Sequence, residues 1–135
     1  MFTVDTIRDT LKKLELSEKK YKLMMGGALC IYGIRESTND IDIGVSGEEF
    51  DRLCNVYSKI PETGYGKFLD VPRIVIETPH GEIEVFRYDN ERHLIAVNIN
   101  TFKCQTLQEI LSWKTALNRE KDRTDIAKIR RYLMQ

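Results

Sequence analysis

Residues 26–43 read GGALCIYGIRESTNDIDI and end in two aspartates that alternate with isoleucines. Side chains along a β-strand point to opposite faces in turn. Asp40 and Asp42 therefore share one face of the predicted strand, while Ile41 and Ile43 share the other. The pattern predicts a strand whose apolar face meets the core and whose second face brings two carboxylates together.

Two neighbouring carboxylates need either water or a cation beside them. Like charges repel, and burying a carboxylate without a partner is costly. A divalent cation between Asp40 and Asp42 would remove this conflict, and oxygen ligands of this kind suit Mg²⁺, with Mn²⁺ as the substitute. The alternative is an edge strand whose acidic face is simply solvated.

The Gly26-Gly27 pair lies between two expected elements, an apolar strand at 21–25 and a short helix at 27–33. Glycine allows the backbone to approach a ligand closely. The N–H groups that begin a helix also bind phosphate well. The pair therefore predicts a phosphate-binding turn that stands one short helix away from the two aspartates.

Composition describes an ordinary globular chain. The 135 residues suggest one domain spanning 1–135, with 41% hydrophobic and 31% charged residues. Lysine plus arginine equals aspartate plus glutamate, so no overall field attracts a long polyanion. The three cysteines lack metal-binding spacing, no apolar run reaches membrane length, and no signal peptide is recognisable. We expect a cytoplasmic protein that does not contact a membrane.

The rest of the chain alternates helix and strand signals. Apolar residues recur at helical spacing in Val4–Leu14, and capping boxes open further helices at Ser46 and Thr106. The other expected elements are a loop at 61–67, strands at Arg73–Thr78 and 82–88 around a turn, an extended segment at 94–104, and a last helix capped by Asp122 with Asp125. This order predicts an α/β (α+β) fold, a small mixed sheet packed by helices.

With its Gly-Gly pair, its spacer 28–39 and its Asp40-Ile41-Asp42 motif, the chain resembles the nucleotidyltransferase-fold superfamily. The lincosamide-type nucleotidyltransferases also carry Gly-Gly at this point, where other members have Gly-Ser. The resemblance implies the minimal nucleotidyltransferase fold and a Mg²⁺-dependent enzyme. Such an enzyme moves a nucleoside monophosphate from an NTP to an acceptor hydroxyl and releases pyrophosphate.

The resemblance also implies a third carboxylate on a later strand. Glu84 fits best, because it lies between Ile83 and Val85 in an alternating segment that follows a turn. The superfamily more often has aspartate there. Glu82, on the same predicted face, is the second choice, and an exposed acidic face is the non-functional alternative. Asp40, Asp42 and Glu84 are thus the expected catalytic and metal-binding residues.

Nucleotide-binding residues are expected on the last two helices as well. Lys114 falls on the apolar side of its helix, where its ammonium group could either reach solvent or meet a phosphate. A lysine followed by Lys121-Asp122-x-x-Asp125 resembles the later motifs of abortive-infection nucleotidyltransferases, which include toxins of toxin–antitoxin pairs. By that resemblance Lys114, Lys121, Asp122 and Asp125 help to form the nucleotide side of the site.

Together these patterns predict a metal-dependent nucleotidyltransferase, with a non-catalytic or regulatory module of the same fold as the rival. Gly26, Gly27 and Ser37 would add phosphate contacts before the aspartate strand. The expected partners are an NTP and an acceptor that the sequence leaves open between a small molecule, a tRNA and a protein. The small size favours an open acceptor cleft or one completed by a second subunit in a homodimer.

Overall fold

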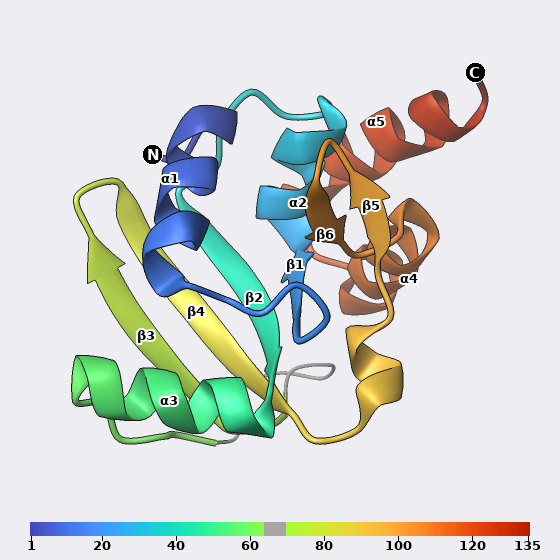
Figure 1. The fold of residues 1–135 in the computed structure, drawn as a ribbon. Helices are drawn as coiled ribbons and strands as arrows, with labels where there is room; N and C mark the ends of the chain where they lie inside the picture. The colour runs from blue at the N-terminus through green and yellow to red at the C-terminus, as the bar shows by residue number, and fades with distance from the viewer. Residues whose placement is uncertain (64–69) are drawn as a thin grey trace.

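A mixed six-stranded sheet forms the frame of the computed structural model, which describes residues 1–63 and 70–135 (Figure 1). The strand order is β3-β4-β2-β1-β6-β5. β2 pairs in parallel with β4 and β1 in parallel with β6, while the other three pairs are antiparallel. The bounds are β1 Tyr21–Met24, β2 Asp40–Ser46, β3 Arg73–Thr78, β4 Gly81–Tyr88, β5 Val97–Ile99 and β6 Phe102–Cys104. The expected small mixed sheet is confirmed.

Helices cover the two faces of this sheet. Their bounds are α1 Val4–Leu14, α2 Met25–Tyr32, α3 Gly47–Tyr57, α4 Leu107–Leu117 and α5 Arg123–Leu133, with 3-10 turns η1 Glu91–Leu94 and η2 Glu120–Asp122. In Figure 1, α1 and α3 lie in front of the sheet, and α4 and α5 pack together at its right. Within the described residues, no helix has both the length and the apolar character that crossing a bilayer requires.

One face of the central strand β2 belongs to the core, and the other face belongs to the site. Ile41, Ile43 and Val45 are completely buried, whereas Asp40, on the other face, is exposed. The predicted alternation is therefore confirmed. Burying side chains of this size stabilises the fold by about 1.5–3 kcal/mol each, so the apolar face of β2 fixes which way the aspartates point.

Both expected capping residues begin their helices. The N–H of Glu49 donates to the hydroxyl of Ser46 at 3.2 Å, and the N–H of Glu109 donates to that of Thr106 at 3.1 Å. Neither glutamate side chain accepts a hydrogen bond from the backbone N–H of its cap residue. Glu49 pairs instead with Arg52 at 2.6 Å, and Glu109 pairs with Lys22 at 3.0 Å. Each capping box is thus half formed, because a nearby cation attracts its carboxylate more strongly than a backbone N–H does.

Three local features differ from expectation. The second helix begins at Met25, so both glycines of the pair lie in its first turn. Asp122 makes no capping hydrogen bond to α5, because cations hold its carboxylate. The extended segment expected at 94–104 is the end of η1 followed by the β5–β6 hairpin. Residues 64–67 of the expected loop lie outside the described residues.

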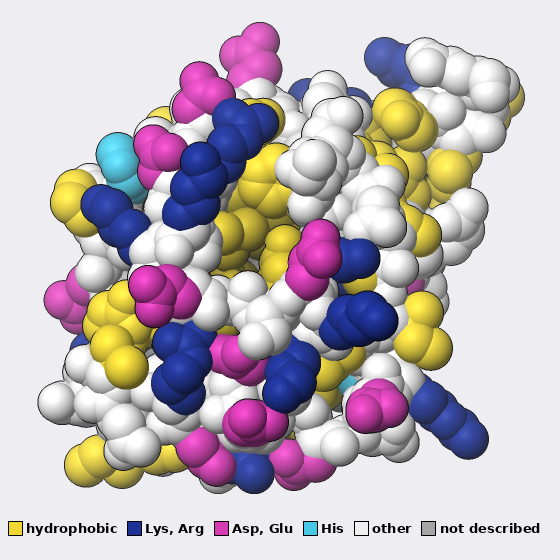
Figure 2. Space-filling model, viewed as in Figure 1, with side chains coloured by type: hydrophobic (Ala, Val, Ile, Leu, Met, Phe, Trp, Pro, Cys, Tyr) yellow, Lys and Arg dark blue, Asp and Glu magenta, His cyan; other side chains and the backbone are white. Residues whose placement is uncertain are grey.

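The space-filling view shows an apolar hollow on the side of the molecule that carries α1 (Figure 2). It has a volume of about 550 Å³ and lies between α1 and the β5–β6 hairpin. Leu11 and Phe102 contribute to its lining, and the guanidinium of Arg8 stands 5.5 Å from the centre of the Phe102 ring. Basic side chains therefore cover part of this apolar surface.

Ile41→Asn and Asp40→Asn form a matched pair that tests the alternation of β2. Asparagine at position 41 would remove a buried side chain and bury an unpaired amide, so we expect a loss of about 3 kcal/mol or more in the free energy of unfolding. Asparagine at the exposed position 40 should change it by less than about 1 kcal/mol in the absence of metal. Urea denaturation measures both, and equal losses would contradict the alternation.

Candidate active site

The acidic residues come together through the register of β2 with β4. Asp42 lies directly opposite Glu84 in this parallel pair, and Asp40 lies opposite Glu82. Residues opposite each other in a sheet project from the same face. Neighbouring strands lie about 4.8 Å apart, so the carboxylates of Asp42 and Glu84 are neighbours. The structure thus brings together the three predicted residues Asp40, Asp42 and Glu84 on one face.

Asp42 is the group whose acidity is most altered. Burial raises its pKa to about 8, helped by the negative charges of Glu84 and Asp40 and by a side-chain hydrogen bond with Glu84. Lys114 acts in the opposite direction. A proton held between Asp42 and Glu84 therefore relieves their repulsion when no cation is present.

Arg73 is a partner of this cluster that sequence reasoning missed. Its guanidinium lies 3.1 Å from the carboxylate of Glu84. Arg73 stands two residues from Val75, which faces Glu84 in the antiparallel β3–β4 pair, so it projects from the same face as that glutamate. Alternation combined with the hairpin register could have identified it, but the sequence alone does not fix that register.

The donor set suits a hard divalent cation, although its side chains are not yet arranged around one. Among the described residues, no three His, Cys, Asp or Glu side chains stand as a ready-made metal site. Glu84 turns toward Arg73, Asp42 shares a hydrogen bond with Glu84, and Asp40 is exposed. Carboxylate oxygens are the ligands that Mg²⁺ and Mn²⁺ accept. The residues fit such an ion once Asp42 loses its proton and the side chains turn.

The two glycines have different surroundings. A Cβ on Gly26 would lie 2.8 Å from the hydroxyl of Thr38 and 3.1 Å from a guanidinium nitrogen of Arg35, so its absence lets the loop before β2 approach the helix. A Cβ on Gly27 would lie 3.0 Å from Leu23 and 3.1 Å from Ile41, inside the core. Gly27 therefore allows α2 to pack closely on the sheet, whereas Gly26 faces the site.

Lys114 is buried, and its ammonium group does not reach solvent. Only 4% of the residue is exposed. Its Nζ donates to Asp122 at 2.7 Å and lies 3.4 Å from Asp125. Arg119 pairs with Asp122 at 2.5 Å, and these two cations hold the pKa of that carboxyl below its usual range, although burial acts against them. Arg35 lies 3.5 Å from Asp125. The later motif is thus one connected ionic network.

This network and the carboxylate cluster face each other across one cleft of about 650 Å³. Its acidic wall contains the side chains from β2 and β4, and its mixed wall comes mainly from α4, η2 and α5. The lining residues are Met25, Gly26, Arg35, Thr38, Asn39, Asp40, Asp42, Glu84, Lys114, Leu117, Arg119, Lys121, Asp122, Thr124, Asp125 and Lys128. Gly27 and Ser37 do not line it, although both were expected to bind nucleotide.

The arrangement separates two kinds of group that a metal-bound polyphosphate requires. Carboxylates on the sheet can hold a divalent cation. Lysine and arginine side chains opposite them can meet phosphate oxygens. Arg119 and Lys128 also line the cleft and were not predicted. The spacing of these two basic residues in the sequence does not distinguish them from ordinary surface residues.

Comparison with known proteins supports the fold. No protein-family model and no curated protein sequence matches the chain. Among solved structures, the lincosamide antibiotic adenylyltransferase LnuA, determined with lincomycin bound, superposes with a TM-score of 0.64 at 13% identity and covers 94% of each chain.

A second solved structure, a candidate nucleotidyltransferase from Thermotoga maritima, gives a TM-score of 0.60 at 11% identity. The superposition covers 98% of this chain and 95% of the other. At such low identities the likeness concerns the fold alone. The six-stranded sheet and these two superpositions together show that the chain shares the fold of these two proteins.

Proposed function

We propose that the chain is a Mg²⁺-dependent nucleotidyltransferase. It would move a nucleoside monophosphate from an NTP to an acceptor hydroxyl, and the products are the nucleotidylated acceptor, pyrophosphate and a proton. The observation that carries this proposal is the cleft in which three sheet carboxylates face the cations of α4, η2 and α5. The names of the two superposed proteins support the same reaction class.

Asp40, Asp42 and Glu84 would hold Mg²⁺, or Mn²⁺ in its place. Such ions lower the pKa of the attacking hydroxyl and neutralise charge on the leaving pyrophosphate. Glu84 would exchange part of its contact with Arg73 for the metal. The first-turn N–H groups of α2 have no partner within the helix, so Gly26, which lines the cleft, could donate to a phosphate oxygen.

Lys114 and Lys121 would contact the phosphates from the opposite wall. Asp122 and Asp125 would hold Lys114 in place, because both lie within ion-pair distance of its Nζ. Phosphoryl transfer depends mainly on positioning and charge stabilisation, and a buried lysine with two fixed partners is well positioned. Cytoplasmic location and a part in a toxin–antitoxin pair stay predictions from the sequence.

A non-catalytic module of the same fold is the second candidate. One observation favours it, namely that Glu84 is already engaged by Arg73 and by Asp42. The two candidates differ in whether they transfer a nucleotide to an acceptor.

To test this, the wild-type chain and Asp42→Asn are incubated with Mg²⁺, each α-³²P-labelled NTP and a cell extract.

Label incorporation into an acceptor by the wild type, lost in Asp42→Asn, supports the enzyme. Mg²⁺-dependent NTP binding without incorporation from any NTP would favour the regulatory module.

Stability should depend on pH in a way that identifies Asp42. Its pKa is about 8 in the folded chain and near 4 when unfolded. The folded state therefore binds this proton more tightly, and the resulting stabilisation is complete below about pH 4 and is lost as pH rises toward 8. Without metal, the free energy of unfolding of the wild type should fall over this range, by at most about 1.4 kcal/mol per pH unit from this group.

Asp42→Asn is the matched control, since it keeps the shape and removes the titration. Its free energy of unfolding should fall less steeply with pH, and saturating Mg²⁺ plus NTP should stabilise the wild type but hardly the variant. Urea denaturation at several pH values measures both effects. Parallel pH curves with equal responses to Mg²⁺ and NTP would contradict the role given to Asp42.

Lys114→Met tests the opposite wall. The change leaves the buried carboxylates of Asp122 and Asp125 without this cation, so we expect a stability loss of about 3–5 kcal/mol together with weaker NTP binding. The double variant Lys114→Met/Asp122→Asn should regain part of the stability but none of the NTP affinity measured by calorimetry with Mg²⁺. Wild-type affinity in the double variant would mean that Lys114 is purely structural.

A further inference from the structure

A second hollow lies on the same sheet face as the carboxylate cluster. It has a volume of about 450 Å³ and shares no residue with the cleft described above. Its lining combines side chains of β1, β4, α4 and η1 with the chain just before β3. We call it the Tyr88 pocket, and its residues are Lys22, Asp70, Val71, Tyr88, Arg92, His93, Glu109 and Trp113.

Tyr88 gives this pocket an unsatisfied polar group. The residue is 7% exposed, and its hydroxyl is buried without a hydrogen-bond partner among the described residues. A buried hydroxyl without a partner costs about 1–3 kcal/mol, and most buried polar groups avoid this situation. A ligand that donates to this oxygen or accepts from its hydroxyl would remove the cost.

The tyrosine ring leans from β4 across β2 toward the carboxylates. A Cβ on Gly44 would lie 2.7 Å from a ring carbon of Tyr88, so the ring occupies the space that any other residue would fill. Burial raises the pKa of Tyr88, and the carboxylates of Glu109 and Asp42 raise it further. The ring therefore lies over β2 at Gly44, two residues along the strand from Asp42.

Helix α4 joins the pocket to the cleft. Lys114 and Leu117 line the cleft, while Glu109 and Trp113 line the pocket. Five residues of a helix span about 7.5 Å, and the four residues from Glu84 to Tyr88 on β4 span about 13 Å. To present a hydroxyl to the carboxylate cluster, an acceptor seated in the pocket would have to span this separation, about 7.5 Å along α4 and about 13 Å along β4.

We propose that the Tyr88 pocket binds the acceptor, and that this acceptor is a small hydroxylated molecule with an apolar ring face, as a sugar or a nucleoside has. The inference rests on the proposed nucleotidyl transfer. Tyr88 and Trp113 supply aromatic surface, and a few polar groups around them would fix the orientation of the ligand, which is the usual composition of a small-molecule site.

The charges of the pocket disfavour a nucleic acid. Lys22 is buried and already pairs with Glu109 at 3.0 Å, and Glu109 also accepts from the side-chain amide of Gln105 at 2.7 Å. Asp70 offsets Arg92 at the exposed side. Binding to a phosphate backbone requires an excess of cations, which these residues do not provide.

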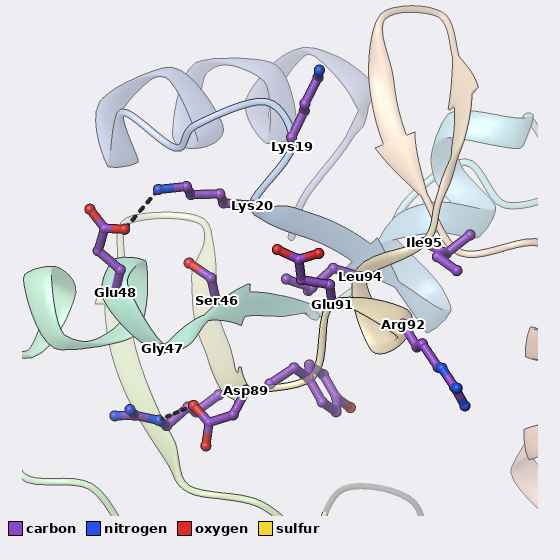
Figure 3. Close-up of a pocket in the computed structure, with 12 residues that line it drawn as sticks. Lys19, Lys20, Ser46, Gly47, Glu48, Asp89, Glu91, Arg92, Leu94 and Ile95 are labelled. Carbon is purple, nitrogen blue, oxygen red and sulfur yellow. Dashed lines mark hydrogen bonds and ion pairs between the residues drawn. The ribbon is translucent and has the colours of Figure 1, made fainter.

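Another hollow, of about 930 Å³, lies beside the start of α3 and is a weaker candidate for the acceptor site (Figure 3). Lys20 extends toward Glu48 and pairs with it at 2.8 Å. Asp89 is held at 2.8 Å by Arg87. Tyr88 also contributes to its wall, but the carboxylates near its hydroxyl, Glu109 and Asp42, do not line this hollow. The acceptor is therefore assigned to the Tyr88 pocket.

Tyr88→Phe tests the assignment with little risk to the fold. Removing an unpartnered buried hydroxyl should leave the stability without ligand unchanged or raise it. Trp113 is the only tryptophan of the chain and reports directly on the pocket. The control is Tyr132→Phe, because Tyr132 is 42% exposed near the end of α5 and lines neither the cleft nor the pocket.

Two readings are taken with a panel of monosaccharides, nucleosides and amino-sugar glycosides. Trp113 emission reports binding. Transfer of label from α-³²P-labelled NTP in the presence of Mg²⁺ reports reaction, and the RNA and protein fractions of a cell extract are offered as acceptors in parallel. We expect panel members to shift the emission and accept label. Tyr88→Phe should weaken acceptor binding about five- to tenfold with unchanged NTP affinity, and Tyr132→Phe should match the wild type.

Label found in RNA or protein, or acceptor binding by Tyr88→Phe equal to that of the wild type, would overturn the assignment. Failure of the proposed transfer looks different. In that case Trp113 would still respond to panel members in a Tyr88-dependent way, while no fraction would accept label.

Discussion

The parallel pairing of β2 with β4 brings like charges together, and the other groups of the site offset their repulsion. It places Asp42 opposite Glu84, with Asp40 two residues away on the same face. These like charges lie on a central part of the sheet that is fixed by the buried isoleucines on its other face. The strand cannot slip to separate them, because a shift of one residue would send the isoleucines to the polar side.

Without a metal, the chain offsets this repulsion with groups of its own. The pKa of Asp42 is raised far above its usual range, so it keeps a proton. Glu84 forms an ion pair with Arg73, and Lys114 contributes a positive charge from α4. Lys114 itself is held by Asp122 and Asp125, so the same ionic network that balances the sheet carboxylates also fixes a cation in the cleft. A metal-bound NTP would replace the shared proton with a stronger partner.

Much of this arrangement could be predicted from local patterns. Alternation along 40–45 identified the face of the aspartates, and the turn before 82–88 indicated the strand that carries Glu84. The register between β2 and β4 depends on tertiary packing, which no local signal encodes. Arg73 was missed because its place beside Glu84 depends on the register of the β3–β4 hairpin. Gly27, expected at phosphate, lies against Leu23 and Ile41 because of how α2 packs on the sheet.

The capping role expected of Asp122 was wrong, because its side chain has a better partner. Asp122 has the sequence position of a helix cap, but two nearby cations hold its carboxylate. Of the two alternatives for Lys114, the structure removes the one in which it reaches solvent, because the residue is buried in an ion pair at the cleft wall. Its contact with phosphate stays a prediction. Both outcomes depend on how α4, η2 and α5 come together, which the spacing of charged residues does not reveal.

The proposed reaction requires that Asp40, Asp42 and Glu84 form a divalent-cation site. Mn²⁺ tests it directly, because the free ion gives a sharp room-temperature electron paramagnetic resonance signal that is lost on binding. Titration of the wild-type chain with Mn²⁺ and a non-hydrolysable NTP should show tight binding beyond that of the NTP alone, and Asp42→Asn and Glu84→Gln should each abolish this excess. Equal Mn²⁺ binding by the wild type and both variants would contradict the claim.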